Sequence, residues 1–226
     1  LYGMKNARKK PAVIHSNIQI KNLPDGIEGF RIVQISDLHL EQSTDKNFLR
    51  DIVDTVNSLS PDLVAITGDL IDAVPHALKG AIEPLGSLKS THGSFFVTGN
   101  HEYYFDAAGW IKEIKNHHVT VLLNSHEIIN HNNEELALAG VTDLTAEQCL
   151  TSHKSDPKKA IEGAPKGAVK ILLAYQPRSI RNAGKGMYDI QLSGHTHGGQ
   201  YFPATELIHF FEPYVKGSYQ VDVPEK

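Results

Sequence analysis

Four side chains that could bind a metal ion stand where short apolar runs end in the first half of the chain. They are two carboxylates, an imidazole and a carboxamide: Asp37, Asp69, His39 and Asn100. Asp37 and His39 are two residues apart, so in an extended segment both project to the same side and can hold one cation. Asp69 follows Asp37 by 32 positions and Asn100 follows Asp69 by 31, about one strand and helix each time. This repetition favours one shared site over three chance occurrences.

A glycine-rich segment in the second half adds two more imidazoles. It reads Ser193-Gly194-His195-Thr196-His197-Gly198-Gly199-Gln200, and its glycines let backbone and ligand approach closely. Alone it could be an exposed turn, but beside the three earlier positions it favours a metal site. Carboxylate, imidazole and amide ligands together suit Mn, Fe, Zn, Ni or Co better than the all-oxygen sites of Ca²⁺ and Mg²⁺.

The apolar runs before these residues have the pattern of an open α/β sheet. Three runs of strand length alternate with segments in which apolar residues recur at helical spacing. The predicted strands are residues 30–35, 63–66 and 95–97, and the predicted helices are residues 45–59, 77–88 and 107–116. Since open sheets of this kind bind ligands at the carboxyl ends of their strands, the polar segments should meet at one edge.

The second half of the chain predicts a second sheet with less helix between its strands. Its strand-like segments are residues 119–123, 127–129, 135–141, 169–174 and 189–193. The polar stretch 142–167 indicates an excursion of helix and loop, and loose apolar alternation over residues 12–20 predicts an edge strand near the start.

Composition is that of an ordinary globular protein. The 226 residues are 40% hydrophobic and 21% charged, enough for one large domain with a substantial core. A formal net charge of −4 argues against a non-specific nucleic-acid coat protein, because the molecule as a whole does not attract phosphate backbones. No apolar run approaches the roughly 18 residues of a membrane-spanning helix, so we expect the chain itself to be soluble.

Basic residues cluster in residues 1–11, ahead of the first predicted strand: Lys5, Arg8, Lys9 and Lys10. Two interpretations are open for this stub. It either follows a membrane anchor or is a solvated tail at the end of the chain. On the first interpretation the full-length protein carries upstream hydrophobic helices and is membrane-associated, on a face that the sequence does not fix.

Four ordered blocks of the chain resemble the signature of the calcineurin-like metallophosphoesterases. They are Ser36-Asp37-Leu38-His39, Thr67-Gly68-Asp69-Leu70-Ile71-Asp72, Thr98-Gly99-Asn100-His101-Glu102 and the glycine-rich segment with its Gly-Gly-Gln ending. That ending is most similar to the membrane-associated branch that includes YkuE-like and transmembrane metallophosphoesterase proteins. The resemblance covers about residues 12–220. It implies an α/β fold, a four-layer αββα sandwich of two mixed β-sheets, with one metallophosphoesterase domain over residues 12–226.

The resemblance also implies a binuclear centre with two divalent metal ions, Mn, Zn, Fe or Ni. The implied ligands are Asp37, His39 and His197 for the first metal, Asp69 for both, and Asn100 and His195 for the second. His101 matches the family's catalytic histidine, which faces the scissile phosphate, and Glu102 is a candidate to orient its ring. Tyr103, Tyr104 and Phe105 either wall the pocket or simply pack.

The sequence departs from the family pattern in two places. Tyr175 stands in Ile171-Leu172-Leu173-Ala174-Tyr175-Gln176-Pro177, where the family has a histidine that completes the second metal. A neutral phenol is a poor ligand for Zn or Mn, so either Tyr175 binds a hard metal such as Fe(III), or the second site is weak, or the chain is a less active member. Relatives also continue past the equivalents of Tyr214 to Tyr219 with further glycine-rich strands, so we expect the domain to be truncated there.

The function implied is metal-dependent hydrolysis of phosphate esters by attack of metal-bound hydroxide on phosphorus. Phosphodiesters or amphiphilic pyrophosphates are the expected substrates, with four aromatic residues as candidates for apolar contact or core packing: Tyr201, Phe202, Phe210 and Phe211. Two alternatives stay open. The chain could be a soluble phosphoprotein or nucleotide phosphatase, or a degenerate module that binds metal or phosphate with little activity because of Tyr175.

Overall fold

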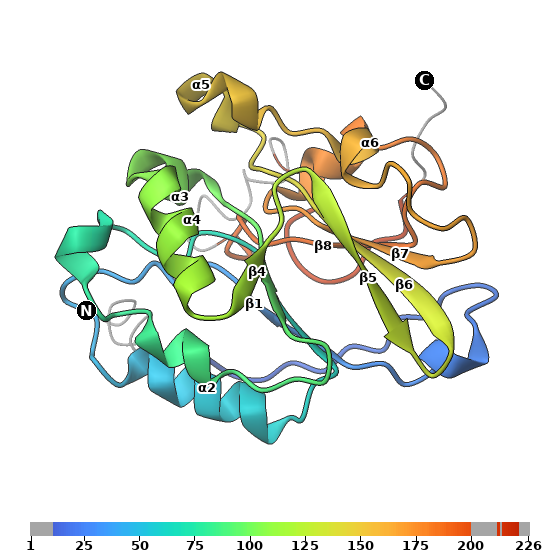
Figure 1. Ribbon diagram of the computed structural model, residues 1–226, viewed down its shortest axis with the longest axis horizontal. Coiled ribbons are helices and arrows are strands. Elements are labelled where there is room, and N and C mark those ends of the chain that lie inside the picture. The colour runs from blue at the N-terminus through green and yellow to red at the C-terminus, as the bar shows by residue number, and fades with distance from the viewer. Residues whose placement is uncertain (1–10, 200–211, 213, 222–226) are drawn as a thin grey trace.

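Two four-stranded sheets make up the centre of the computed structural model, which describes residues 11–199, 212 and 214–221 (Figure 1). The first sheet has the order β1-β2-β3-β4 and its paired strands all run parallel. Its strands are β1 (Ile32–Ile35), β2 (Leu63–Ile66), β3 (Ser94–Phe96) and β4 (Val119–Val121). Residues 119–123, which we grouped with the second sheet, therefore provide the edge strand of the first.

The second sheet has the order β5-β6-β7-β8 and is mixed. Its strands are β5 (Ser125–His131), β6 (Glu134–Gly140), β7 (Val169–Leu173) and β8 (Ile190–Leu192). β5 and β6 form an antiparallel hairpin, whereas β6, β7 and β8 pair in parallel. The predicted α/β class with two sheets is thus confirmed, and of the two sheets only the second is mixed over the described strands.

Helical segments connect the strands. The α-helices are α2 (Phe48–Ser58), α3 (Asn100–Tyr104), α4 (Ala107–Asn116), α5 (Ala146–Cys149) and α6 (Pro157–Ala160). The 3₁₀ segments are η1 (Asp25–Ile27), η2 (Pro75–Leu78), η3 (Glu83–Ser87), η4 (Thr151–His153) and η5 (Pro177–Asn182). The short α5, η4 and α6 form the predicted excursion of residues 142–167.

Side-chain alternation along the strands produces the four layers. In β2, Val64 and Ile66 face a core shared with the helices of the first sheet, while Leu63 and Ala65 face the core between the two sheets. In β7, Ile171 lies in the core between the sheets, and neighbouring side chains of the second sheet pack with α6 on the far face. Three apolar cores therefore separate four layers.

Two predicted elements are wrong. Residues 12–20 form no strand, and Ile14 and Ile18 are exposed there. Residues 77–88 are not an α-helix but parts of η2 and η3, because Gly80 adopts a φ of 78° between them and Pro84 cannot donate a helical hydrogen bond. The helical spacing of the apolar residues survives in these turns, which still bury Leu78 and Leu85.

Several predictions concern residues that lie outside the described part. They include the basic residues of the stub and Gln200, Tyr201, Phe202, Phe210 and Phe211. Among the helices that the structure does describe, none is both long and apolar enough to cross a membrane.

Candidate metal centre

The loops after β1 and β2 bring the first three candidate ligands together. These loops stay paired beyond the strands, because Asp37 N–H donates to the Gly68 carbonyl and His39 N–H donates to the Asp69 carbonyl, each at 3.1 Å. Asn100 begins α3, directly after the end of β3. The structure thus brings Asp37, His39 and Asp69 to the carboxyl edge of the first sheet, and Asn100 stands at the end of the third strand.

The glycine-rich segment reaches the same place from the second sheet. His195 N–H donates to both oxygens of the Asp37 carboxylate, at 3.1 and 3.2 Å. Gly194 makes this approach possible, since a β-carbon at that position would clash with the side chains of Ser36 and Asp37. The carboxyl ends of β1 and β8 thus share one site.

Asp37, His39 and His197 form a group whose ligand atoms lie within 4.8 Å of one another. The two imidazoles face each other with Nε2 atoms 3.1 Å apart, and His197 Nε2 lies 3.4 Å from Asp37 Oδ1. These are the residues implied for the first metal. His197 is exposed, so solvent and substrate can reach this group.

A second group contains His39, Asp69 and His101. His39 Nε2 and His101 Nε2 lie 3.8 and 3.7 Å from Asp69 Oδ2. Asp69 is 1% exposed, as expected for a carboxylate at the centre of the site. His101 therefore lies beside Asp69 and His39 at the centre of the candidate site.

The other implied ligands of the second metal are Asn100 and His195. The side-chain oxygen of Asn100 is buried and has no hydrogen-bond partner among the described residues, which suits an amide oxygen that binds a metal. The His195 ring packs edge-on against Tyr175, with ring centroids 5.0 Å apart. Within the described residues, His195 joins neither of the two groups.

Two supporting carboxylates were not given these roles by the sequence. Asp72 Oδ1 accepts hydrogen bonds from Nδ1 of His39 at 2.8 Å and of His101 at 2.6 Å. We expected Glu102 to orient the His101 ring, but its side chain has a different role. It is fully buried and accepts from the backbone N–H groups of Gly99, Asp69 and Leu70, so it fixes the loops that carry the ligands.

The pKa values of the site follow from burial and from these contacts. Burial lowers the pKa of His39, but Asp72, Asp69 and Asp37 outweigh it and the net shift is upward. Burial opposes ionisation of Asp72, yet the two histidines lower its pKa. Burial and the Asp69 charge raise the pKa of Glu102 to about 8.

Five of the implied ligands adopt a left-handed backbone. The φ values are 55° for Asp37, 46° for His39, 48° for Asp69, 76° for His195 and 48° for His197. Residues with side chains rarely adopt this conformation, and such strain gathers at functional sites. The strained positions therefore mark the same site that the motifs do.

The three aromatic residues after Glu102 have different surroundings. Tyr103 is buried and its hydroxyl contacts Thr98 and His153, and Phe105 packs against the core of the first sheet. Tyr104 is 61% exposed, with its ring centroid 5.4 Å from that of His101. Packing explains two of the three, and Tyr104 remains at the open side of the site.

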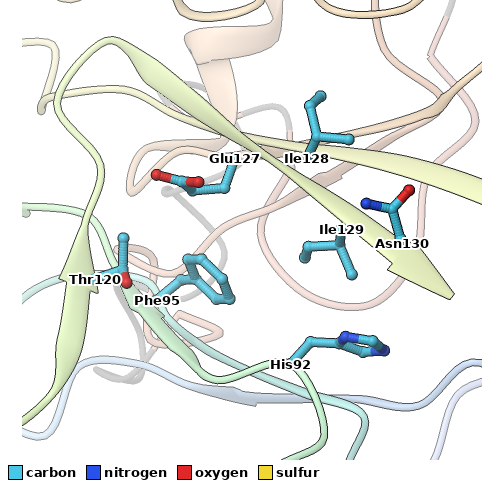
Figure 2. Close-up of a pocket in the computed structure, with 7 residues that line it drawn as sticks. All are labelled: His92, Phe95, Thr120, Glu127, Ile128, Ile129 and Asn130. Atoms are coloured by element: carbon cyan, nitrogen blue, oxygen red, sulfur yellow. The ribbon is translucent and has the colours of Figure 1, made fainter.

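A hollow of about 350 Å³ lies elsewhere, between β3 and β4 of the first sheet and β5 of the second (Figure 2). Figure 2 shows Phe95 and Thr120 on one side and Glu127 on the other. His92, which also lines it, precedes β3, whereas the metal centre follows that strand. The hollow is therefore separate from the predicted site.

The family model described as calcineurin-like phosphoesterase matches residues 30–199, a span that contains both groups that could hold a metal ion. This chain belongs to the calcineurin-like phosphoesterase family. The divalent metals that this family uses fit the His and Asp groups of the site.

Relatives of this calcineurin-like phosphoesterase confirm the branch. It is 39% identical to the "Transmembrane protein with metallophosphoesterase domain" of Danio rerio, over 98% of this chain and 52% of the relative. It is 29% identical to the UDP-2,3-diacylglucosamine pyrophosphatase LpxG of Chlamydia muridarum, over 77% of this chain and 65% of that protein. The chain thus spans about half the length of the first of these relatives.

A solved structure supports the fold of this phosphoesterase. The NAD nucleotidase NadN of Haemophilus influenzae superposes with a TM-score of 0.53 and 17% sequence identity. The likeness covers 74% of this chain and 43% of the nucleotidase.

Proposed function

We propose that the chain hydrolyses phosphodiesters or amphiphilic pyrophosphates at this centre. The group of Asp37, His39 and His197 carries the proposal, because it offers one carboxylate and two imidazoles around a single point at the open edge of the sheets. Mn, Zn, Fe and Ni accept this ligand set. When bound, such ions polarise the phosphoryl group and supply a nucleophilic water at neutral pH.

Asp72 prepares both histidines for their tasks. Nδ1 of His39 carries the ring proton and donates it to Asp72. The lone pair of Nε2 therefore stays free for a metal. His101 is held in the same way, and its Nε2 points towards Asp69. When His101 is protonated, the nearby Asp72 charge stabilises the imidazolium, which can donate a proton to the leaving oxygen of the substrate.

The substrate class is inferred from the open side of the site. Tyr104 presents an exposed aromatic ring beside His101, a surface suited to an apolar part of the leaving group. The name of the Chlamydia relative specifies a pyrophosphate that carries acyl chains. Tyr104→Ala should raise KM for an acylated pyrophosphate more than for an analogue without acyl chains, and an equal change for both would count against this contact.

Membrane association of the full-length protein belongs to the same proposal. It is supported by the name of the Danio rerio relative, which specifies a transmembrane protein. A membrane location would bring the site to amphiphilic substrates. Fractionation of cells that express the full-length protein tests this, and recovery of that protein in the soluble fraction would contradict it.

The hydrolysis itself is tested with chromogenic substrates. Protein stripped of metal is reloaded with Mn, Zn, Ni or Fe and assayed with bis(p-nitrophenyl) phosphate and with p-nitrophenyl phosphate, alongside metal analysis. We expect metal-dependent release that favours the diester, lost in Asp37→Asn and retained in Asp156→Asn, where the side chain caps α6. Release from the monoester alone would indicate a phosphatase. Bound metal without hydrolysis of either substrate would indicate a binding module.

A further inference from the structure

Tyr175 places a hydroxyl group inside the metal centre. The residue follows β7, is 1% exposed, and donates from its hydroxyl to Asp37 Oδ1 at 2.9 Å and to Asp69 Oδ2. The two carboxylates come from the ends of β1 and β2 in the first sheet. One hydroxyl from the second sheet therefore contacts both acidic ligands.

Packing fixes the position of this hydroxyl. Gly68 leaves room for the ring, since a β-carbon there would lie 2.8 Å from Tyr175 Cδ2. The ring also meets His195 edge-on, and the Tyr175 carbonyl accepts from Gly194 N–H at 3.0 Å. The hydroxyl is thus held by contacts on several sides and is not free to turn away from the carboxylates.

The contact with Tyr175 reduces the electrostatic repulsion between the two carboxylates. Two ionised carboxylates that lie on either side of one hydroxyl in a largely buried site repel, and a cation between them normally removes that repulsion. Here a shared hydroxyl proton supplies part of the compensation. Asp69 Oδ1 also accepts from His101 N–H at 2.9 Å, so both oxygens of the residue implied to bridge two metals already have a donor.

We propose that Tyr175 is a positioning residue that holds Asp37 and Asp69 together through its hydroxyl, so that the site binds one divalent metal tightly, at Asp37, His39 and His197, and a second only weakly. The inference rests on the proposed function only in taking this group as the metal site. For the second metal the protein offers Asp69, Asn100 and His195, and a phenol that donates to carboxylates adds no ligand.

The test measures metal content and thermal unfolding, with turnover recorded separately. The full chain is stripped of metal and titrated with Mn²⁺ or Zn²⁺ as wild type, Tyr175→His, Tyr175→Phe and Tyr188→Phe. Tyr188 is the matched control, because its partly buried hydroxyl donates to the Pro157 carbonyl on the outer face of the second sheet. Equilibrium dialysis with elemental analysis gives the stoichiometry.

We expect one tightly bound metal in the wild type and two in Tyr175→His, with second-site affinity increased at least tenfold. Tyr175→Phe keeps the ring but removes the hydroxyl. Tyr175→Phe should lower the melting temperature of the metal-free protein more than Tyr188→Phe does. Adding metal should then raise the melting temperature of Tyr175→Phe by more than it raises that of the wild type. A role in packing alone would produce neither change.

Two tight metals in the wild type would overturn the inference, as would a Tyr175→Phe protein that matches Tyr188→Phe in both temperatures. The proposed function fails separately. A wild type that binds one metal but hydrolyses no phosphate ester contradicts the function and leaves the inference standing. A wild type that hydrolyses phosphate esters but binds two metals tightly supports the function and contradicts the inference.

Discussion

Replacing Asp72 with Asn tests how far one carboxylate controls the centre. Asp72 Oδ1 accepts from Nδ1 of both His39 and His101, so the change weakens two ring contacts together. Asn keeps the size of the side chain and one acceptor oxygen, but it loses the charge. The neutral amide can therefore accept from one ring or both, each bond weaker than a charge-assisted one.

The expected size of the effect follows from what outer partners of metal ligands do. Loss of such a partner reduces metal affinity or activity by about 10–100-fold, or about 1.4–2.8 kcal/mol. His39 belongs to both metal-binding groups, so we expect metal affinity to fall by this factor. Turnover at saturating metal should fall by a similar factor of about 10–100, because His101 loses the same partner.

The pH dependence distinguishes this account from simple damage to the site. Asp72 helps to raise the pKa of His39, and a protonated His39 cannot bind metal. As the solution is acidified, the wild type should therefore begin to lose metal affinity while the pH is still above 6.5, the ordinary pKa of histidine. The metal affinity of Asp72→Asn should begin to fall only at a lower pH. The difference in affinity between the two proteins then shrinks on acidification.

Isothermal titration with Zn²⁺ or Mn²⁺ between about pH 8 and pH 5.5, across the titration range of histidine, measures both quantities. Asp156→Asn, which replaces an N-cap carboxylate on α6, is the matched control and should bind like the wild type. The reasoning is refuted if Asp72→Asn binds as tightly as the control at pH 8, or if its deficit stays constant over the whole range.

Three further substitutions separate the roles of other residues. Asp69→Ala should reduce metal content at saturating metal, measured by elemental analysis, because Asp69 is the implied bridge between the two positions, and a metal content equal to that of the wild type would contradict its central place. His101→Ala should keep its metal while turnover falls by about 10²–10⁴-fold, as for loss of a placed acid, and loss of metal would make His101 a ligand. Glu102→Gln tests linkage. Because folding raises the Glu102 pKa from 4.5 to about 8, the folded state holds the proton more tightly, and the free energy of unfolding should fall as pH rises through that window. Urea unfolding of the metal-free variant should show a flatter pH dependence than the wild type, and an unchanged slope would refute this.

The strands of the first sheet and the gathering of candidate ligands at its edge could be predicted because both depend on local pattern. A buried parallel strand is apolar on both faces, so it appears in the sequence as a continuous apolar run. The prediction for residues 63–66 coincides with β2. Since parallel strands all end at the same edge, the polar residues after β1, β2 and β3 had to lie close to one another.

The errors arise where apolar spacing is ambiguous. Residues 77–88 have helical spacing, but Gly80 and Pro84 divide the segment into 3₁₀ turns that bury the same side chains. Residues 12–20 alternate like a strand, yet no neighbouring strand pairs with them among the described residues. A strand needs a partner, and a single segment carries no information about whether one is available.

The supporting contacts could not be predicted, because they join segments that are distant in the sequence. Glu102 is about thirty residues from the Asp69 and Leu70 N–H groups that it accepts, and Tyr175 reaches Asp37 from the other sheet. Asp72 was visible three positions after Asp69, but nothing local shows that two histidines will donate to it. Such roles depend on how loops and sheets pack.

The left-handed backbone of the ligands explains why these contacts matter. Each non-glycine residue held at positive φ costs of order 1–3 kcal/mol, and Asp37, His39, Asp69, His195 and His197 are all held there. Such strain persists only where the surroundings fix the conformation. Hydrogen bonds provide this support: Glu102 fixes the Asp69 loop, Asp72 fixes His39 and Tyr175 fixes Asp37. Asp37, His39 and the Asp69 loop are thus held in place by the fold itself, before any metal contributes binding energy.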